Sequence, residues 1–410
     1  MLTNKQMEKF AELAVRVGAN MQKNQEVVIR CDVQCADFAH LIAQKAYEFG
    51  AKFVHTEWLD EKLDRINMLN ASKEALSDIP NYRTALWNYF IERKCCLISI
   101  SAGDPNKYKG CDADKLSAYE IAFNIARNAF RQATMSNYLR WTIVSIPTPA
   151  WAQQIFPEDT AETATDKLWN AIGHIMRLDQ DDPTAAWRKH INTLVSRAEF
   201  MTKHNFEYIR MKNAAGTDLS VGLATDHVWI AAEEEGQDGI RFTANMPTEE
   251  VFTAPHNRKI NGKVVNALPL VNNGNVIDNF SITFKDGKVT DFTAETGYEA
   301  LKGLLESDEG VLSLGEIALI GKKSPIAESG ILFYNTLFDE NASCHLAFGA
   351  SYPTTVKNGN NMTAEQLAQH GMNQSIQHVD FMVGTKDIDI DGIGYDGKVT
   401  PLFRNGEWVI

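Results

Sequence analysis

The stretch Glu26-Val-Val-Ile-Arg-Cys31 sets the fold of the first half of this chain. Its apolar run is short and rich in β-branched residues, so it predicts a buried strand rather than a helix. Before it, apolar residues from Met7 to Met21 recur at helical spacing among charged ones, with a helix stop at Gly18. After it, residues 35–49 repeat the helical pattern, which ends at Gly50.

The same alternation of predicted strands and helices continues through the first half. Three more apolar runs predict strands, and two longer stretches have helical spacing: strands at Lys52–Glu57, Cys96–Ser101 and Trp141–Ile146, and helical stretches at 72–94 and 115–136. The last strand runs into the breaker Pro147-Thr-Pro149. Such alternation implies right-handed crossovers and a mostly parallel sheet with helices on both faces. We therefore expect an N-terminal α/β domain.

The pattern changes near Asp181-Asp-Pro183 and a helical stretch from Trp187 to His204. Beyond it, short alternating strands and turn dipeptides dominate; Phe280–Phe284 running into Asp286-Gly287 is a strong hairpin signal. This half is expected to be a β-rich α+β domain with an antiparallel, barrel-like or strongly curved sheet. Because 410 residues exceed what one core usually supports, we place two domains at 1–185 and 186–410.

Composition excludes several classes of protein. A net charge of -13 argues against nucleic-acid binding, which needs concentrated Lys and Arg. No apolar run approaches the length of a membrane span, and the N-terminus has the pattern of an amphipathic helix rather than of a secretory signal. None of the six cysteines has zinc-motif spacing, so we expect free thiols. A cytoplasmic protein is the expectation.

Two acidic positions stand in apolar surroundings. In His378-Val-Asp380, apolar neighbours predict a strand, whose period of two would place both side chains on one face and within reach of one ion. A core histidine tied to a carboxylate remains an alternative. Glu316 lies among Leu and Ile residues with no basic residue until Lys322, so it would be costly to bury without a cation. Divalent metal binding is the simplest explanation, with a paired structural carboxylate as the alternative.

A third region, Glu340 to Pro353, is rich in small residues and is expected to form a loop or a short helix. It contains Glu340, His345 and Tyr352. Cys344 beside His345 could suggest a thiol nucleophile with its base, but adjacent side chains usually diverge. Glu250 follows another glutamate and would ordinarily be surface charge; it could join the other acids only through the fold.

Taken together, these segments resemble the aminopeptidase T / aminopeptidase S / PepS family of metallo-aminopeptidases. The resemblance rests on five segments in order: Asn245-Met-Pro-Thr-Glu-Glu250-Val-Phe-Thr, Leu314-Gly-Glu316-Ile-Ala-Leu, Glu340-Asn-Ala-Ser-Cys-His345-Leu-Ala-Phe-Gly, Tyr352-Pro and His378-Val-Asp380. It implies a pair of divalent ions bound by Glu250, Glu316, His345, His378 and Asp380, with Glu340 as a sixth ligand. It also implies an active-site role for Tyr352, and a homodimer.

The chemistry expected of such a site is peptide hydrolysis. Two ions, which could be Zn, Co, Mn or Mg, can activate a water and polarise the scissile carbonyl. Glu316 is the expected proton acceptor and Tyr352 the expected donor to the oxyanion. The substrates would be short peptides with a free N-terminus. Another two-metal hydrolase such as a phosphoesterase, or a non-enzymatic peptide-binding protein with a structural metal, are the alternatives.

Overall fold

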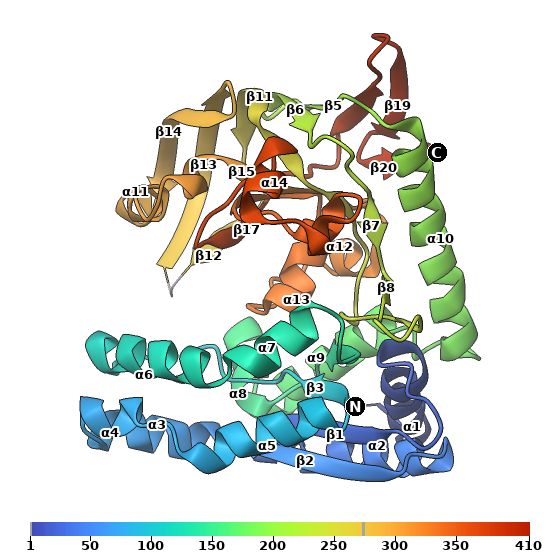
Figure 1. Ribbon diagram of the computed structural model, residues 1–410, viewed down its shortest axis with the longest axis vertical. Helices are drawn as coiled ribbons and strands as arrows, with labels where there is room; N and C mark the ends of the chain where they lie inside the picture. The colour runs from blue at the N-terminus through green and yellow to red at the C-terminus, as the bar shows by residue number, and fades with distance from the viewer. Residues whose placement is uncertain (1, 273–274) are drawn as a thin grey trace. The chain divides into compact units, whose positions relative to one another are not determined.

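The structure is a computed structural model and describes residues 2–272 and 275–410 (Figure 1). The chain divides into two compact units, and each unit takes in two stretches of sequence. The first comprises Met1–Lys189 and Glu233–Pro247, and the second His190–Ala232 and Thr248–Ile410. Compactness does not show that a unit folds alone, so the domains at 1–185 and 186–410 stay a prediction.

The first unit is built on a parallel sheet of four strands in the order β2-β1-β3-β4. These strands are β1 (Glu26–Asp32), β2 (Phe53–Leu59), β3 (Cys96–Ile100) and β4 (Trp141–Val144). Helices cover both faces. On one face Val28 and Leu97 pack with Trp87 and Phe130, whereas on the other α2 packs against β1. The expected α/β fold with a mostly parallel sheet is confirmed.

The helices of this unit agree with the predicted stretches in part. They are α1 (Asn4–Leu13), α2 (Ala36–Glu48), α3 (Glu61–Asn70), α4 (Lys73–Ser77), α5 (Asn81–Glu92), α6 (Ala113–Ala126), α7 (Asn128–Met135), α8 (Pro149–Ile155) and α9 (Ala161–Ile175). Three of them, α3, α8 and α9, lie outside the predicted elements. Pro149 ends the preceding extended segment and also occupies the first turn of α8, where a missing N–H costs nothing. Helix α10 (Pro183–His204) leads into the second unit.

The second unit contains two antiparallel sheets, as expected for a β-rich domain. The larger has the order β12-β13-β11-β6-β5-β18-β19-β20, with β14 beside β13. Its strands are β5 (Tyr208–Lys212), β6 (Asp218–Leu223), β11 (Pro255–Val265), β12 (Leu270–Asn272), β13 (Asn275–Lys285), β14 (Lys288–Thr296), β18 (Asp389–Ile393), β19 (Val399–Arg404) and β20 (Glu407–Trp408). The hairpin predicted at Asp286-Gly287 joins β13 to β14.

The smaller sheet has the order β17-β16-β15-β10-β7. It consists of β7 (Ile230–Ala231), β10 (Val251–Thr253), β15 (Leu314–Leu319), β16 (His345–Gly349) and β17 (His378–Met382). Short helices lie in its connections: α12 (Pro325–Ser329), α13 (Thr336–Asp339) and α14 (Ala364–Gln369) between its strands, and α11 (Tyr298–Leu305) between β14 and β15. Among the described residues, no helix is both long enough and apolar enough to cross a membrane.

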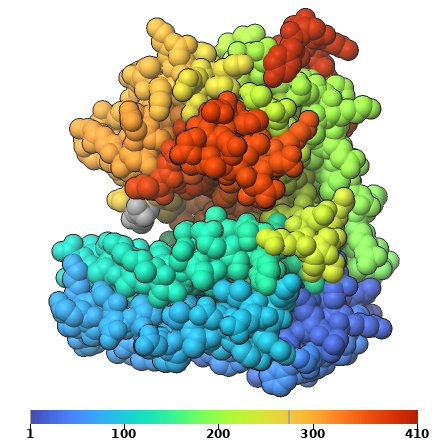
Figure 2. All heavy atoms as spheres, viewed as in Figure 1, coloured from blue at the N-terminus to red at the C-terminus, as the bar shows by residue number. Residues whose placement is uncertain are grey.

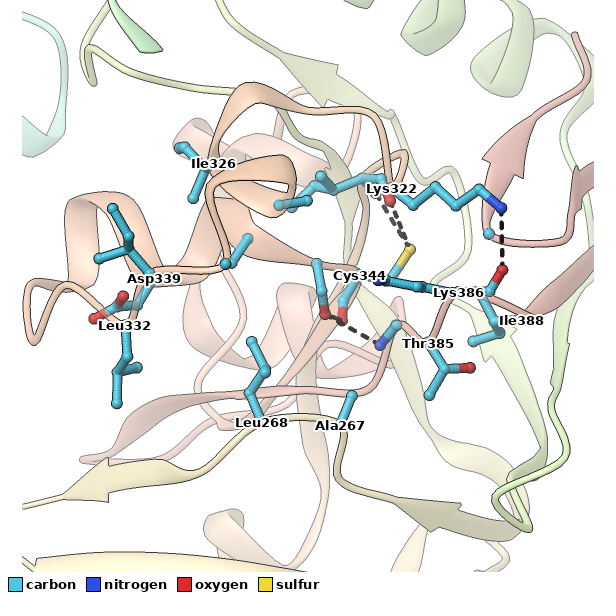
Figure 3. A pocket seen from close by; sticks show the side chains of 18 of the residues that line it. Ala267, Leu268, Lys322, Ile326, Leu332, Asp339, Cys344, Thr385, Lys386 and Ile388 are labelled. Carbon is cyan, nitrogen blue, oxygen red and sulfur yellow. Dashed lines mark hydrogen bonds between the residues drawn. The ribbon is translucent and has the colours of Figure 1, made fainter. Parts of the chain in front are cut away.

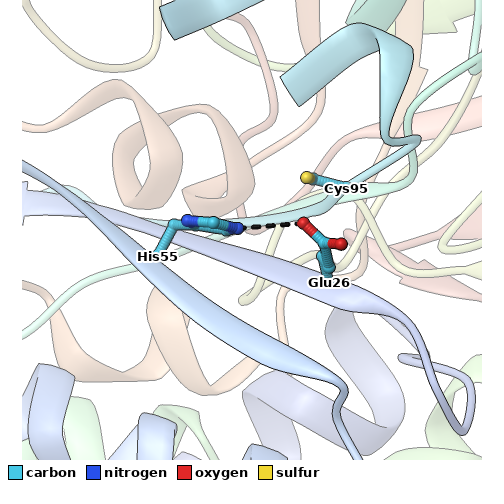
Figure 4. Close-up of side chains that lie close together, drawn as sticks. All are labelled: Glu26, His55 and Cys95. Carbon is cyan, nitrogen blue, oxygen red and sulfur yellow. Dashed lines mark hydrogen bonds and ion pairs between the residues drawn. The ribbon is translucent and has the colours of Figure 1, made fainter. Parts of the chain in front are cut away.

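A buried carboxylate organises one end of the sheet in the first unit. Glu26 opens β1 and accepts hydrogen bonds from Arg93 and from Lys52 Nζ at 2.9 Å, while His55 Nε2 lies 3.0 Å away. The Arg93 hydrogen bond outweighs burial and holds the Glu26 pKa well below its ordinary value. Cys95 lies close to Glu26 and His55 (Figure 4), and these three side chains are of the kind and spacing that can hold a metal. Burial raises the Cys95 pKa to about 12, and two cations already neutralise the carboxylate, so we assign this cluster a structural role.

We expect Glu26→Gln to lower the free energy of unfolding by about 2 kcal/mol at pH 7, because it removes charge-assisted hydrogen bonds from a buried acceptor. A carboxyl whose pKa is depressed in the folded state stabilises fully above its unfolded pKa near 4.5, and less as the pH falls below it. The difference from wild type in urea unfolding should therefore narrow at pH 3.5. Glu48→Gln, at an exposed position, is the control; an equal difference at both pH values would contradict the assignment.

Candidate metal centre

One face of the five-stranded sheet carries acids and histidines with small residues between them. Strand register places Glu316, Ala347 and Asp380 side by side on β15, β16 and β17. A second row runs from Phe252 through Ala318 and His345 to Met382. His378 lies opposite Gly349, at the end of β16. The small side chain of Ala347 leaves space above the sheet between the two carboxylates.

The opposite face of the same strands packs into the core of the second unit. Ile317, Leu346, Phe348 and Phe381 all belong to its large apolar cluster, and the rings of Phe348 and Phe381 stack at 4.4 Å. Because side chains alternate along a strand, burying these residues forces the acids and histidines onto the other face. The core therefore sets the orientation of the site.

The polar side chains of this face converge in two groups that share Glu316. Within each group one potential ligand atom per residue lies within 4.8 Å of the others: Glu250, Glu316 and His345 in the first, and Glu316, His378 and Asp380 in the second. His345 Nε2 lies 3.2 Å from Glu316 Oε1 and 3.5 Å from Glu250 Oε2. His378 Nε2 lies 3.9 Å from Glu316 Oε2 and 3.4 Å from Asp380 Oδ1.

Each histidine is oriented by a main-chain carbonyl behind it. His378 Nδ1 lies 2.7 Å from the carbonyl oxygen of Ala350, and His345 Nδ1 lies 3.3 Å from that of Ser343. These contacts direct both Nε2 atoms toward the carboxylates. A carbonyl behind the second ring nitrogen is a common arrangement for metal-ligating histidines.

The acids of the cluster lie close together, and this crowding changes their pKa values. Burial, followed by the negative charge of Glu316, raises the pKa of Glu250 to about 8. Burial and the charge of Glu250 raise the pKa of Glu340 well above its ordinary value. Asp380 differs, because the hydrogen bond from His378 and the nearby histidines outweigh burial and lower its pKa.

The histidines respond in the opposite direction. Burial disfavours their charged forms, but the carboxylates around them outweigh it and raise the pKa of His345 to about 10 and that of His378 to about 9. Within the described part of the chain, no Lys or Arg pairs with the four carboxylates; Glu250, Glu316 and Asp380 have the two histidines as ion-pair partners. Asp380 Oδ1 is buried, and its contact with His378 Nε2 is long, at 3.4 Å. A divalent cation would satisfy this set of groups.

Glu340 and Tyr352 come from the connections around β16. Glu340 opens a 3-10 turn, η4 (Glu340–Ala342), and lies outside both three-residue groups. The Tyr352 ring centroid is 4.7 Å from that of His378 and 6.4 Å from that of Phe252, and the residue is 42% exposed. Partial burial, and then the negative charge of Glu316, raises the Tyr352 pKa above its ordinary value, so the phenol keeps its proton.

The expectation of a loop or short helix from Glu340 to Pro353 is wrong for His345. His345 begins strand β16, which pairs with both β15 and β17. The alternating Leu346 and Phe348 enter the core, and this burial outweighs the small residues that suggested irregular structure. Ala347 and Gly349, the small residues between them, border the cluster. In the sequence, the small side chains at these alternate positions were the feature that could have indicated a strand bordering a site.

Residues 3–408 of the chain match the model of a family described as thermophilic metalloprotease (M29). Aminopeptidase 2 of Geobacillus stearothermophilus is 45% identical over 404 residues, which are 98% of each chain. Aminopeptidase PepS of Streptococcus thermophilus is 41% identical over 98% of each chain. The solved structure of wild-type AmpT from Thermus thermophilus, 35% identical, has a TM-score of 0.91 over 99% of each chain.

The chain belongs to the M29 metalloprotease family. The resemblance inferred from the five motifs is thereby confirmed, and the protein is a metallopeptidase, a hydrolase of peptide bonds. A thiol nucleophile is excluded by the position of Cys344. This thiol is hydrogen-bonded to the main chain of Ile320, and burial raises its pKa to about 12.

Cys344 instead lines a cavity of about 380 Å³ in the second unit of this M29 protein (Figure 3). The cavity walls are largely apolar, with Ile326, Leu332 and Ile388 among them, and Lys322 and Lys386 near one side. None of the six candidate ligands lines it. Cys344 and His345 have different surroundings although they are adjacent, because the side chains of consecutive residues in a strand point to opposite sides of the sheet.

We expect Zn²⁺ binding to the metal-free protein at pH 7 to release protons, because ligands must be deprotonated and Glu250, His345 and His378 have pKa values above 7. Raising the pH removes these competing protons, so the affinity should increase between pH 6 and 8. Isothermal titration calorimetry in two buffers of different ionisation enthalpy counts the protons; when all three groups bind, on the order of three are expected. Binding without proton release, or an affinity independent of pH, would argue against these ligands.

Proposed function

We propose that this metallopeptidase removes N-terminal amino acids from short peptides, using two divalent ions. The observation that carries the proposal is the position of Glu316, whose two oxygens face different histidines at 3.2 and 3.9 Å. A carboxylate shared between two groups of ligands can bridge two ions. Its relatives in the M29 family are named aminopeptidases, which supports the choice of substrate end.

The ligands that we propose are those of the two groups, with Glu340 as a sixth: Glu250, Glu316, Glu340, His345, His378 and Asp380. Their mixture of carboxylate and imidazole donors suits Zn or Co, and also accepts Mn or Mg. Bound there, the ions would lower the pKa of a water, polarise the scissile carbonyl and offset the oxyanion charge.

Residues of the chain supply the remaining chemistry. Where an oxygen of Glu316 is not committed to an ion, we propose that it accepts a proton from the attacking water and passes it to the leaving amine. Tyr352 keeps its hydroxyl proton and lies at the exposed side of the cluster, so it can donate a hydrogen bond to the developing oxyanion. An excess of carboxylates offers a partner for the positively charged α-amine of a substrate, which would restrict cleavage to the first residue.

A phosphoesterase is the less favoured reading of the same site. Such an enzyme needs cations for the phosphate oxygens, and no Lys or Arg pairs with the cluster in residues 2–272 and 275–410. A non-enzymatic protein with a structural metal is also less favoured, because it would not explain the exposed Tyr352 beside the ligands.

Chelation should abolish hydrolysis of leucine p-nitroanilide, and Zn²⁺ or Co²⁺ should restore it, because the ligands have no other cation to replace the ions. N-acetylation of the substrate should remove nearly all cleavage, since the group that holds the amine is left unpaired. p-Nitrophenyl phosphate serves as the control substrate and should not react. Equal rates on the free and acetylated anilides would contradict an aminopeptidase.

Tyr352→Phe should leave the bound metal unchanged and lower kcat on the order of a hundredfold, because only the oxyanion hydrogen bond is lost. Glu316→Gln should lower kcat by several orders of magnitude and also reduce metal content, since it removes both a ligand and a base. Elemental analysis and steady-state kinetics separate the two effects. Tyr395→Phe, at an exposed site in the same unit, is the control. Wild-type turnover by Tyr352→Phe would rule out its catalytic role.

We further propose a homodimer, located in the cytoplasm. The six cysteines are all unpaired, in keeping with a reducing compartment. Helix α6 contains apolar residues on several sides, yet none of its residues is buried, and Ile121 and Ile125 are 59% and 72% exposed. Its atoms lie at the surface of the first unit (teal, Figure 2). A second copy would cover this surface.

Light scattering should therefore report about twice the 45.8 kDa of one chain. Ile125→Asp should shift the assembly to monomers, because a charge would be buried at the contact. Asn170→Asp, at an exposed position of α9 rather than α6, should leave the dimer intact. A wild-type monomer at micromolar concentration would contradict the dimer.

A further inference from the structure

Asn341 is a fully buried amide that joins two segments of the second unit. Its exposed fraction is 0%, and it lies in the 3-10 turn between α13 and β16. The side-chain Oδ1 accepts the main-chain N–H of Glu249 at 2.8 Å. Its Nδ2 donates to the carbonyl of Leu337 at 3.2 Å, so both ends of the amide are used.

The covalent neighbours of this hydrogen bond are two carboxylates of the metal centre. Glu340 immediately precedes Asn341, and Glu250 immediately follows Glu249. The two segments that carry these acids are far apart in sequence and belong to different connections of the sheet. In the described structure, Asn341 provides a direct hydrogen bond between them.

These two segments carry like charges that oppose their approach. Glu250 and Glu340 each directly follow or precede a residue of the Asn341–Glu249 hydrogen bond, and their ionised carboxylates would repel each other. The amide also stays neutral, so it can join the segments without adding charge to the cluster. Its main-chain carbonyl accepts a hydrogen bond from Ser324 at 3.3 Å, which fixes the turn from a third side.

The 248–249 segment also contacts helix α10. His190 Nε2, on helix α10, lies 2.8 Å from the carbonyl oxygen of Thr248 and 3.4 Å from Glu249 Oε2. The segment that leads into β10 therefore has contacts with both α10 and Asn341.

We infer that Asn341 is a positioning residue that sets the separation of Glu250 and Glu340 and thereby the affinity of the centre for a divalent ion. The inference rests on the proposed metal site and goes beyond it by assigning a residue that is not itself a ligand. Partners behind metal ligands typically change metal affinity ten- to a hundredfold when they are removed.

The experiment measures the Zn²⁺ affinity of purified, metal-free protein by competition with a fluorescent chelator. Its readout does not depend on catalytic activity. Asn341→Ala should weaken binding about tenfold or more. Asn266→Ala is the matched control, because Asn266 also bridges two segments, accepting from Phe280 N at 2.7 Å and donating to the Leu268 carbonyl at 3.0 Å. It should lower the melting temperature of the metal-free protein comparably and leave the affinity within about twofold.

A double-mutant cycle distinguishes positioning from a general loss of structure. If Asn341 acts by placing Glu340, Asn341→Ala should have little further effect on Zn²⁺ affinity in a Glu340→Gln background. Additive losses, or an unchanged affinity in Asn341→Ala, would overturn the inference. Failure of the wild-type protein to bind Zn²⁺ would instead refute the metal site itself. Should Asn341→Ala not fold, Asn341→Ser, which cannot reach Glu249 N, is measured in its place with the same expected loss.

Discussion

Mutual repulsion among buried carboxylates is the constraint on which the second unit depends. Four acids and two histidines occupy one side of a five-stranded sheet, and the described chain brings no Lys or Arg to neutralise them. Protons hold such a cluster together in the absence of a cation, as the raised pKa values of His345 and Glu250 indicate. A divalent ion does so at lower cost, because it binds carboxylates and imidazoles directly.

The rest of the unit can be understood as the means of holding that cluster. Phe348, Phe381 and their neighbours bury the back of the sheet, and this burial offsets the cost of presenting acids on the front. Carbonyl groups of Ala350 and Ser343 orient the two imidazoles, and Asn341 joins the segments of Glu250 and Glu340. Gly349, with φ of +96°, closes β16 where a Cβ would collide with the Gln377 carbonyl.

The first unit uses charge in the opposite way. Its buried carboxylate, Glu26, is neutralised by Arg93 and Lys52 and needs no metal, although Glu26, His55 and Cys95 lie as close together as the ligands of the other centre. Residue types and distances alone would not separate the two sites. What separates them is the presence or absence of cationic side chains within hydrogen-bonding reach.

Local patterns in the sequence determined much of this protein. The four parallel strands, the hairpin at Asp286-Gly287 and the shared face of His378 and Asp380 all follow from apolar runs, turn residues and a period of two, and the structure has each of them. The five motifs also predicted the family. These features depend on neighbours within a few residues, which is why one sequence suffices to predict them.

Only the tertiary structure decided which strands lie beside one another and what borders the cluster. The order β17-β16-β15-β10 brings Glu250 next to Glu316 and His345, although Glu250 by itself resembled surface charge. It also makes a strand of the segment that begins at His345, places Ala347 between two carboxylates, and sets Asn341 against Glu249. Strand pairing joins residues distant in sequence, and burial of the opposite face selects the register, so local patterns could not reveal these contacts.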